Sequence, residues 1–182
     1  MSTRTALLLI DVQKGFKEPC WGERNNPMAE ENISLLLNNF RQTKQSIFHI
    51  QHLSREKFSP LQPGQVGVEF MEGFEPKFDE ILIQKKVNSA FMATPLENEL
   101  RFKEITTLVM AGFTTDHCIS SSARMAANLG FKVQLVTDAT VAFARQGPIL
   151  YPPELVHQVS LASLNREFAS LVNTVQLAKH WL

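Results

Sequence analysis

Cys118 lies in a segment whose residue types suit nucleophilic catalysis. The segment reads Gly112-Phe113-Thr114-Thr115-Asp116-His117-Cys118 and joins an apolar run to a helical pattern. A thiol in the first turn of a helix feels the positive end of the helix dipole, which lowers its pKa. Free backbone N–H groups in the same turn can hold a developing oxyanion. Cys118 is therefore a candidate nucleophile, and the alternative is a buried structural cysteine.

An acidic residue and a basic pair follow two other apolar runs. Asp11 directly follows Thr5–Ile10 and can act as a base in a crevice. Lys85 and Lys86 follow Ile81–Gln84, and an ammonium beside a thiol favours the thiolate. Taken singly, these residues also have structural interpretations as a loop carboxylate and a solvated lysine pair. Together they predict that an acid, an amine and a thiol meet in one crevice.

Short apolar runs alternate with helical patterns along the chain, and the spacing predicts the following elements. The strands are Thr5–Ile10, Ile47–His52, Ile81–Gln84, Thr106–Ala111, Lys132–Thr137 and one within Ala169–Gln176. The helices are Asn32–Lys44, Pro95–Arg101 capped by Thr94, residues 117–129 ending before Gly130, and Pro153–Arg166. Ser54–Lys77 is rich in Gly and Pro and predicts a long loop of the kind that often forms a lid or binding site.

This alternation predicts an α/β fold with three layers, in which helices cover both faces of a mainly parallel six-stranded sheet. No linker or repeat divides the 182 residues, so we expect one domain over residues 1–182. Ligands of such sheets bind outside the carboxyl ends of the strands. The residues that follow predicted strand ends, and are expected there, are Asp11, His52, Lys85, Lys86, Thr114 to Cys118 and Asp138.

The composition argues against several classes of function. Eighteen basic residues balance eighteen acidic ones with no run of Lys or Arg, so we expect no nucleic-acid or membrane-surface role. No apolar stretch reaches the ~20 residues that span a bilayer, and Ala6–Ile10 is too short for a signal peptide. Cys20 and Cys118 lie far apart and form no disulfide framework. We expect a cytoplasmic protein with reduced thiols.

Three ordered motifs cover most of the chain. The first is Leu8-Leu9-Ile10-Asp11-Val12-Gln13 with Phe16, the second is Lys85-Lys86-Val87-Asn88-Ser89-Ala90-Phe91 with Thr94 and Leu96, and the third is Gly112 to Cys118. The match continues through Gly130 and Asp138. Together these motifs resemble the isochorismatase-like cysteine hydrolases, the relatives of nicotinamidase and N-carbamoylsarcosine amidohydrolase.

The resemblance implies a catalytic triad of Asp11, Lys85 and Cys118. Asp11 would take the thiol proton and later deliver it to the leaving amine. Cys118 would attack a carbonyl carbon to give an acyl-enzyme, and Lys85 would stabilise the ion pair. The family lysine usually lies four residues before a serine, here Ser89, which favours Lys85 and leaves Lys86 as the alternative.

The resemblance also implies a cis peptide bond between Phe113 and Thr114, which would aim the backbone N–H groups of Thr114 and Cys118 at the oxyanion. Metal-containing members carry an Asp-x-His before the lysine. This chain has Ile50-Gln51-His52 instead, so we expect no metal, and no cofactor is implied. Isochorismate-cleaving members generally lack the cysteine, which argues against vinyl-ether hydrolysis but leaves it as an alternative.

Several side chains are candidates for lining a substrate pocket, where aromatic groups would bind a flat or apolar acyl group. They are Phe16, Trp21, His52, Phe91 and His117. For Phe91 and Trp21 the alternative is a place in the core. The family's usual assemblies imply a homodimer or homotetramer, with the terminal Trp181 at a subunit interface.

Three functions therefore compete. The first is hydrolysis of a C–N bond in a small carboxamide or ureido compound, which makes a small molecule the partner. The second is thiol redox chemistry at Cys118, with Cys20 resolving the oxidised sulfur if the two are close. The third is a non-catalytic binding role on a retained fold. The sequence carries no recognisable code for the substrate.

Overall fold

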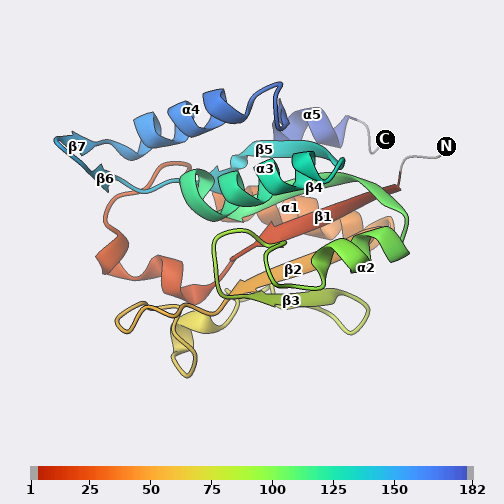
Figure 1. The fold of residues 1–182 in the computed structure, drawn as a ribbon, viewed down its shortest axis with the longest axis horizontal. Helices are drawn as coiled ribbons and strands as arrows, with labels where there is room; N and C mark the ends of the chain where they lie inside the picture. The colour runs from red at the N-terminus through yellow and green to blue at the C-terminus, as the bar shows by residue number, and fades with distance from the viewer. Residues whose placement is uncertain (1–3, 180–182) are drawn as a thin grey trace.

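The computed structural model describes residues 4–179, and its centre is a parallel sheet of six strands (Figure 1). The strands are β1 (Arg4–Ile10), β2 (Ser46–His52), β3 (Ile81–Lys85), β4 (Ile105–Phe113), β5 (Lys132–Val141) and β8 (Ser170–Val172). Their order across the sheet is β3-β2-β1-β4-β5-β8. From β1 the chain adds β2 and β3 on one side and then β4, β5 and β8 on the other. In such sheets a crevice forms at the carboxyl ends of the strands where the order changes side.

Helices cover both faces of the sheet, which confirms the predicted three-layer α/β fold. They are α1 (Ala29–Gln42), α2 (Leu96–Phe102), α3 (Ser120–Asn128), α4 (Pro153–Leu164) and α5 (Thr174–Ala178). Buried side chains of α2, α3 and α4 share one hydrophobic cluster, and those of α1 and α5 share the cluster on the opposite face. No helix within residues 4–179 has the length and apolarity to cross a membrane.

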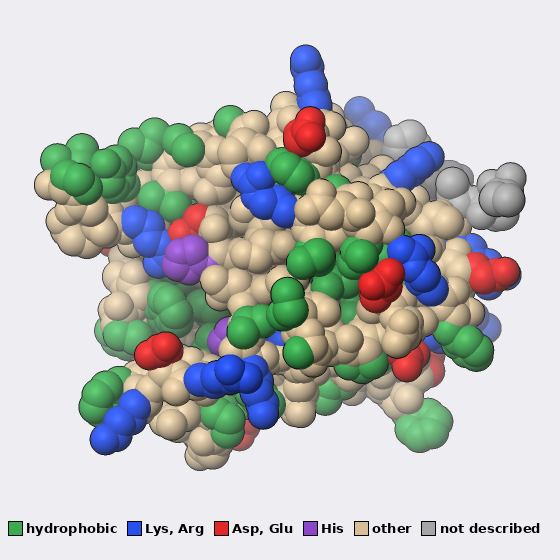
Figure 2. Space-filling view, in the orientation of Figure 1, with side chains coloured by type: hydrophobic (Ala, Val, Ile, Leu, Met, Phe, Trp, Pro, Cys, Tyr) green, Lys and Arg blue, Asp and Glu red, His purple; other side chains and the backbone are tan. Residues whose placement is uncertain are grey.

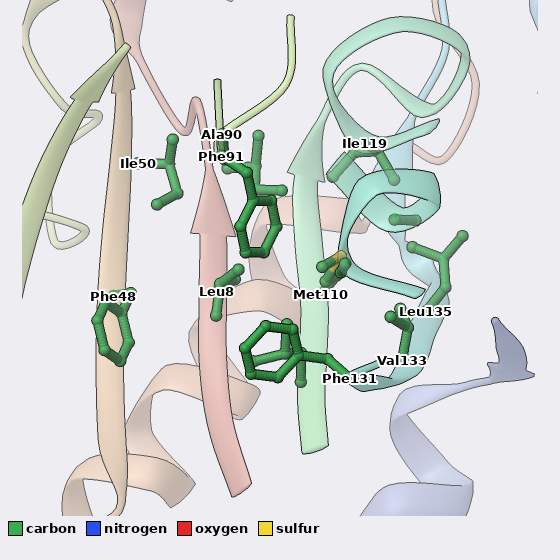
Figure 3. Close-up of a cluster of buried hydrophobic side chains, with 14 of the residues drawn as sticks. Leu8, Phe48, Ile50, Ala90, Phe91, Met110, Ile119, Phe131, Val133 and Leu135 are labelled. Carbon is green, nitrogen blue, oxygen red and sulfur yellow. The ribbon is translucent and has the colours of Figure 1, made fainter. Parts of the chain in front are cut away.

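The continuous apolar run of β1 is explained by burial on both sides. Leu8 and Ile10 enter the cluster that faces α2 and α3, whereas Leu7 and Leu9 enter the cluster that faces α1. Figure 3 shows Leu8 among side chains from neighbouring strands in the first of these clusters. A strand buried on both faces has no reason to alternate polar and apolar residues.

Several element boundaries differ from the sequence prediction. The helix predicted at residues 117–129 begins instead with a π-helical turn, Thr115–Ile119, and continues as α3. The residue at the N-cap of α2 is Pro95 and not Thr94, although the Thr94 hydroxyl accepts a bond from the Leu96 N–H at 3.4 Å. The last predicted strand shortens to β8 because α5 follows it at once. A hairpin of β6 (Arg145–Gln146) and β7 (Leu150–Tyr151) was not predicted.

The long loop between β2 and β3 is confirmed, with one 3-10 turn at Val66–Val68. It packs on the segment that follows β1. The Gly67 backbone lies against Gly15, and Gln13 forms an isolated antiparallel β-bridge with Phe70. The loop therefore lies beside the carboxyl end of β1. Trp181, expected at an interface, lies outside the described residues.

Gly112 lies at the carboxyl end of β4, directly against the backbone of β1. It pairs with Ile10 across the two strands, and its φ of 126° is in the region that favours glycine. A Cβ at this position would lie 2.0 Å from the Ile10 carbonyl oxygen. Only glycine therefore allows β4 to approach β1 at the point just before the Cys118 segment.

We expect Gly112→Ala to lower the free energy of unfolding by about 3 kcal/mol or more, since the methyl group meets fixed backbone. Gly130→Ala is the matched control, because Gly130 also has a positive φ of 87° but no atom within 4 Å of the added Cβ. It should cost only about 1–2 kcal/mol, the penalty for a left-handed backbone at a residue with a Cβ. Urea denaturation measures both, and equal losses would contradict the close approach.

Candidate active site

Three buried side chains meet at the carboxyl edge of the sheet. Asp11 follows β1, Lys85 ends β3, and Cys118 lies in the π-helical turn after β4. The Lys85 side chain extends past the end of β2, and its Nζ lies 2.7 Å from Asp11 Oδ2 and 3.2 Å from Cys118 Sγ. The side chains of Asp11 and Lys85 are fully buried. Lys86, the alternative lysine, is exposed.

Burial and charge act in opposite directions on these groups. Burial alone would lower the pKa of Lys85, but the Asp11 carboxylate and the Cys118 sulfur raise it above its ordinary value, so Lys85 is an ammonium. Burial and the Asp11 carboxylate raise the pKa of the Cys118 thiol, and Lys85 opposes them only in part. The sequence predicted a lowered thiol pKa from the helix dipole, and this was wrong, because desolvation of the buried sulfur and the nearby Asp11 carboxylate raise the pKa. The direction of this shift favours the protonated form of Cys118.

Only one of the two carboxylate oxygens of Asp11 forms a hydrogen bond within the described residues. Oδ2 accepts from Lys85, whereas Oδ1 is buried without a hydrogen-bond partner among the described residues. A carboxylate oxygen of Asp11 lies within 4.8 Å of Cys118 Sγ. The backbone of Asp11 has a φ of 55°, an uncommon conformation for a residue with a side chain. Such strain costs about 1–3 kcal/mol and is found most often at functional sites.

The turn that carries Cys118 is held by bonds on several sides. The Thr114 carbonyl accepts from the N–H groups of His117 and Ile119, at 3.2 and 3.1 Å. It does not accept from the Cys118 N–H, which lies between these two in the sequence. The Thr115 hydroxyl lies 2.9 Å from His157 Nδ1. The peptide bond between Phe113 and Thr114 is cis, as expected.

An ion pair anchors the outer side of the same turn. Asp116 accepts two bonds from Arg145, at 2.6 and 3.2 Å, and Arg145 also reaches the Thr114 hydroxyl at 3.5 Å. Arg145 lies in the β6–β7 hairpin that the sequence did not predict. The guanidinium holds the pKa of the Asp116 carboxyl below its usual value despite its burial.

A cavity of about 160 Å³ opens beside Cys118. Four of the predicted pocket residues line it, namely Phe16, Trp21, His52 and His117. Figure 2 shows histidine side chains reaching the surface next to hydrophobic ones on this face, at the left of the view. Phe91 was predicted to line the pocket and does not. It packs in the hydrophobic cluster of Figure 3, 6.1 Å from the Phe131 ring.

An aromatic stack supports the wall of the cavity. Phe16 lies 4.9 Å from Trp21 and 5.2 Å from Phe113, measured between ring centroids, and Phe143 packs behind both Phe16 and Trp21. The indole N–H of Trp21 donates to the Gly15 carbonyl at 2.8 Å. The rings are therefore fixed in place and offer an apolar surface to a bound group.

A protein-family match covers the segments that carry these site residues. The family described as the Isochorismatase domain matches residues 5–176. The chain belongs to the isochorismatase family. Members of this family are hydrolases, and the buried Asp, Lys and Cys lie in the matched region.

Relatives of known sequence or structure agree with this assignment. The isochorismatase family protein YrdC of Bacillus subtilis is 42% identical over 100% of this chain and 98% of its own. A solved structure of an isochorismatase-family protein from Chromobacterium violaceum is 36% identical, with a TM-score of 0.94 over 99% of this chain and 94% of that chain.

Two more distant isochorismatase relatives have names that state a reaction. Nicotinamidase 3 of Arabidopsis thaliana is 26% identical over 97% of this chain and 88% of its own. The ureidoacrylate amidohydrolase RutB of Methylobacterium radiotolerans is 28% identical over 59% of this chain and 39% of its own.

The donor set at this isochorismatase-family site does not fit a metal ion. Asp11, His52 and Cys118 each bring a ligand atom within 4.8 Å of the others. The ammonium of Lys85, however, lies within 3.2 Å of all three groups and fills the space that a cation would need. A second positive charge there would meet direct repulsion.

Several site residues were missed by the sequence interpretation. They complete the cavity wall and are Ser54, Glu56, Ser59, Leu61, Asn88 and Thr114, the last predicted only as a backbone donor. Asn88 lies inside a motif, and its Oδ1 is 3.8 Å from Cys118 Sγ. The others in the loop carry no pattern that marks them. Asp138, expected just after a strand end, instead lies within β5 and accepts from the N–H and the hydroxyl of Thr174 at the start of α5.

Replacing Lys85 tests the buried ion pair. Lys85→Met leaves the Asp11 carboxylate buried and unpaired, so we expect it to lower the free energy of unfolding by about 3–5 kcal/mol. Asp11→Asn combined with Lys85→Met should recover part of this loss, because no charge remains unpaired. Lys86→Ala is the control and should stay within about 0.5 kcal/mol of the wild type. Chemical denaturation at pH 7 measures all three, and a loss below about 1 kcal/mol for Lys85→Met would contradict the pairing.

Proposed function

We propose that this protein is a cysteine amidohydrolase that cleaves the C–N bond of a small carboxamide or ureido compound through an acyl-enzyme. The observation that carries the proposal is the buried contact of Lys85 with both Asp11 and Cys118 at the wall of a cavity. The names of the nicotinamidase and ureidoacrylate amidohydrolase relatives support the class of bond.

In the first step the thiol proton moves to Asp11. The uncommitted Oδ1 is the acceptor that this transfer needs, since Oδ2 is already bonded to Lys85. The transfer leaves a thiolate beside the Lys85 ammonium and a neutral carboxylic acid. Lys85 stabilises the thiolate without giving up its own proton, because its pKa is raised. Because the pKa of the thiol is raised, the thiolate is short-lived and forms immediately before the attack on a bound substrate.

In the second step the thiolate sulfur bonds to the substrate's carbonyl carbon. The carbonyl oxygen becomes an oxyanion, which the backbone N–H groups of Thr114 and Cys118 stabilise. Removing one such donor typically costs about 100–1,000-fold in rate. Asp11 then returns its proton to the leaving nitrogen, the C–N bond breaks, and the amine or ammonia departs. The product is a thioester on Cys118.

Hydrolysis of the thioester repeats the steps with water. Asp11, again a carboxylate, takes a proton from water as the oxygen attacks the acyl carbon. Collapse of this second intermediate breaks the C–S bond, and the proton returns to the sulfur. The acid is released and the resting thiol is restored.

The size and wall of the cavity favour a small substrate with an apolar or flat acyl group. A volume of about 160 Å³ is below the usual range of about 300–1,000 Å³ for drug-sized ligands. Phe16 and Trp21 supply the apolar surface, while Ser54, Asn88 and His117 supply polar contacts. Cys20 is exposed and lines a different hollow with Phe58 and Pro60, so nothing favours it as a resolving thiol for Cys118.

An acyl adduct on Cys118 is the expected intermediate. Incubation with a panel that includes nicotinamide, benzamide and N-carbamoylglycine should release ammonia, and rapid acid quenching should trap an acyl group on the peptide that contains Cys118. We expect Cys118→Ala to lose at least about 10,000-fold in kcat, since the nucleophile is gone. Cys20→Ala is the matched control and should keep its rate.

Two outcomes would contradict the proposal. Ammonia release that persists in Cys118→Ala would show that Cys118 is not the nucleophile. Fast peroxide consumption with no adduct from any amide would instead favour thiol redox chemistry.

A further inference from the structure

His52 is fixed in place from both sides of its backbone. It ends β2 and is the register partner of Lys85 in β3. Gln13, fully buried, accepts from the His52 N–H at 2.8 Å and donates to the His52 carbonyl at 3.1 Å. A third bond joins Gln13 to the Val68 carbonyl at 2.8 Å. A buried amide with all these bonds made holds the end of β2 rigidly.

The His52 ring supplies the third acceptor that the Lys85 ammonium requires. An ammonium has three N–H donors and accepts nothing. Two of these donors go to Asp11 and Cys118, and the third goes to His52 Nδ1 at 2.8 Å. All three directions of Lys85 are therefore occupied, and the ammonium cannot turn away from Cys118 without losing a bond in a buried site.

This contact also decides the protonation of the imidazole. Because Lys85 can only donate, Nδ1 must be the acceptor, and the ring carries its proton on Nε2. Burial, and then the Lys85 charge, lower the pKa of His52, which keeps the ring neutral. The ring is also part of the cavity wall.

We propose that His52 is a positioning residue, which holds the Lys85 ammonium against Cys118 by accepting its third N–H. The inference rests on the proposed role of Lys85 beside the nucleophile. It assigns His52 a function through Lys85, separate from its contribution to the cavity wall.

Nitrogen NMR tests the protonation directly. In the folded wild-type protein at neutral pH, ¹⁵N shifts and ring couplings should identify His52 as neutral, with its proton on Nε2. A proton on Nδ1 would overturn the proposal, because that nitrogen could not then accept from Lys85.

Alkylation of Cys118 by iodoacetamide tests the consequence, in a Cys20→Ala background so that one thiol reacts. Asn places its Oδ1 near the position of Nδ1, whereas Gln places its polar atoms near Nε2 and Ala places none. His52→Asn should therefore react within about threefold of the wild type. His52→Gln and His52→Ala should react about 10-fold more slowly or worse, the effect of losing a hydrogen bond to a charged group.

Gln84→Ala is the control, since Gln84 precedes Lys85 on the exposed side of β3, and it should match the wild type. Thermal unfolding of each variant shows whether it is folded, and only folded variants are compared. If His52→Asn reacts as slowly as His52→Ala, or if none differs from the wild type, the proposal is wrong. These readouts need no substrate, so they stand even if no amide is hydrolysed and the proposed function fails.

Discussion

The site depends on one buried positive charge. Lys85 is an aliphatic chain that ends in an ammonium, and its side chain is fully buried. An isolated ammonium would be very costly in that environment, and only close acceptors make it tolerable. Asp11, His52 and Cys118 supply them from three different elements. Asp11, His52 and Cys118 are therefore positioned together around Lys85, since moving any one of them would leave a buried ammonium N–H without an acceptor.

The sheet brings these elements together at one edge. β2 lies between β1 and β3, so Lys85 must cross the end of β2, and His52 at that end is in position to meet it. β4 follows on the other side of β1, where Gly112 permits the close approach that delivers the Cys118 turn. The long loop after β2 then closes one wall of the cavity. The chemistry thus depends on strand order, and each strand end contributes one part.

Much of this could be predicted from the sequence because the signals were local. Apolar runs indicated five of the six strands closely, and three motifs indicated Asp11, Lys85 and Cys118. What could not be predicted depended on tertiary contacts. Phe91 has the type of a pocket residue, but α2 and Phe131 bury it in the core. The thiol pKa follows from the desolvation of Cys118, which no spacing reveals. Glu56 and Ser59 lie in a loop that has no periodic pattern. The ion pair of Arg145 with Asp116 depends on the β6–β7 hairpin, whose two strands of two residues each are too short to leave a pattern in the sequence.

The central claim is that Asp11 acts as the base for Cys118, and a pre-steady-state burst tests it most directly. With p-nitrophenyl acetate as an acylating probe, the wild type should release a stoichiometric burst of p-nitrophenol and carry the acetyl group on Cys118. A folded Asp11→Asn variant should acylate about 100-fold more slowly or worse, the usual contribution of a general base. A burst at the wild-type rate in that variant would contradict the account.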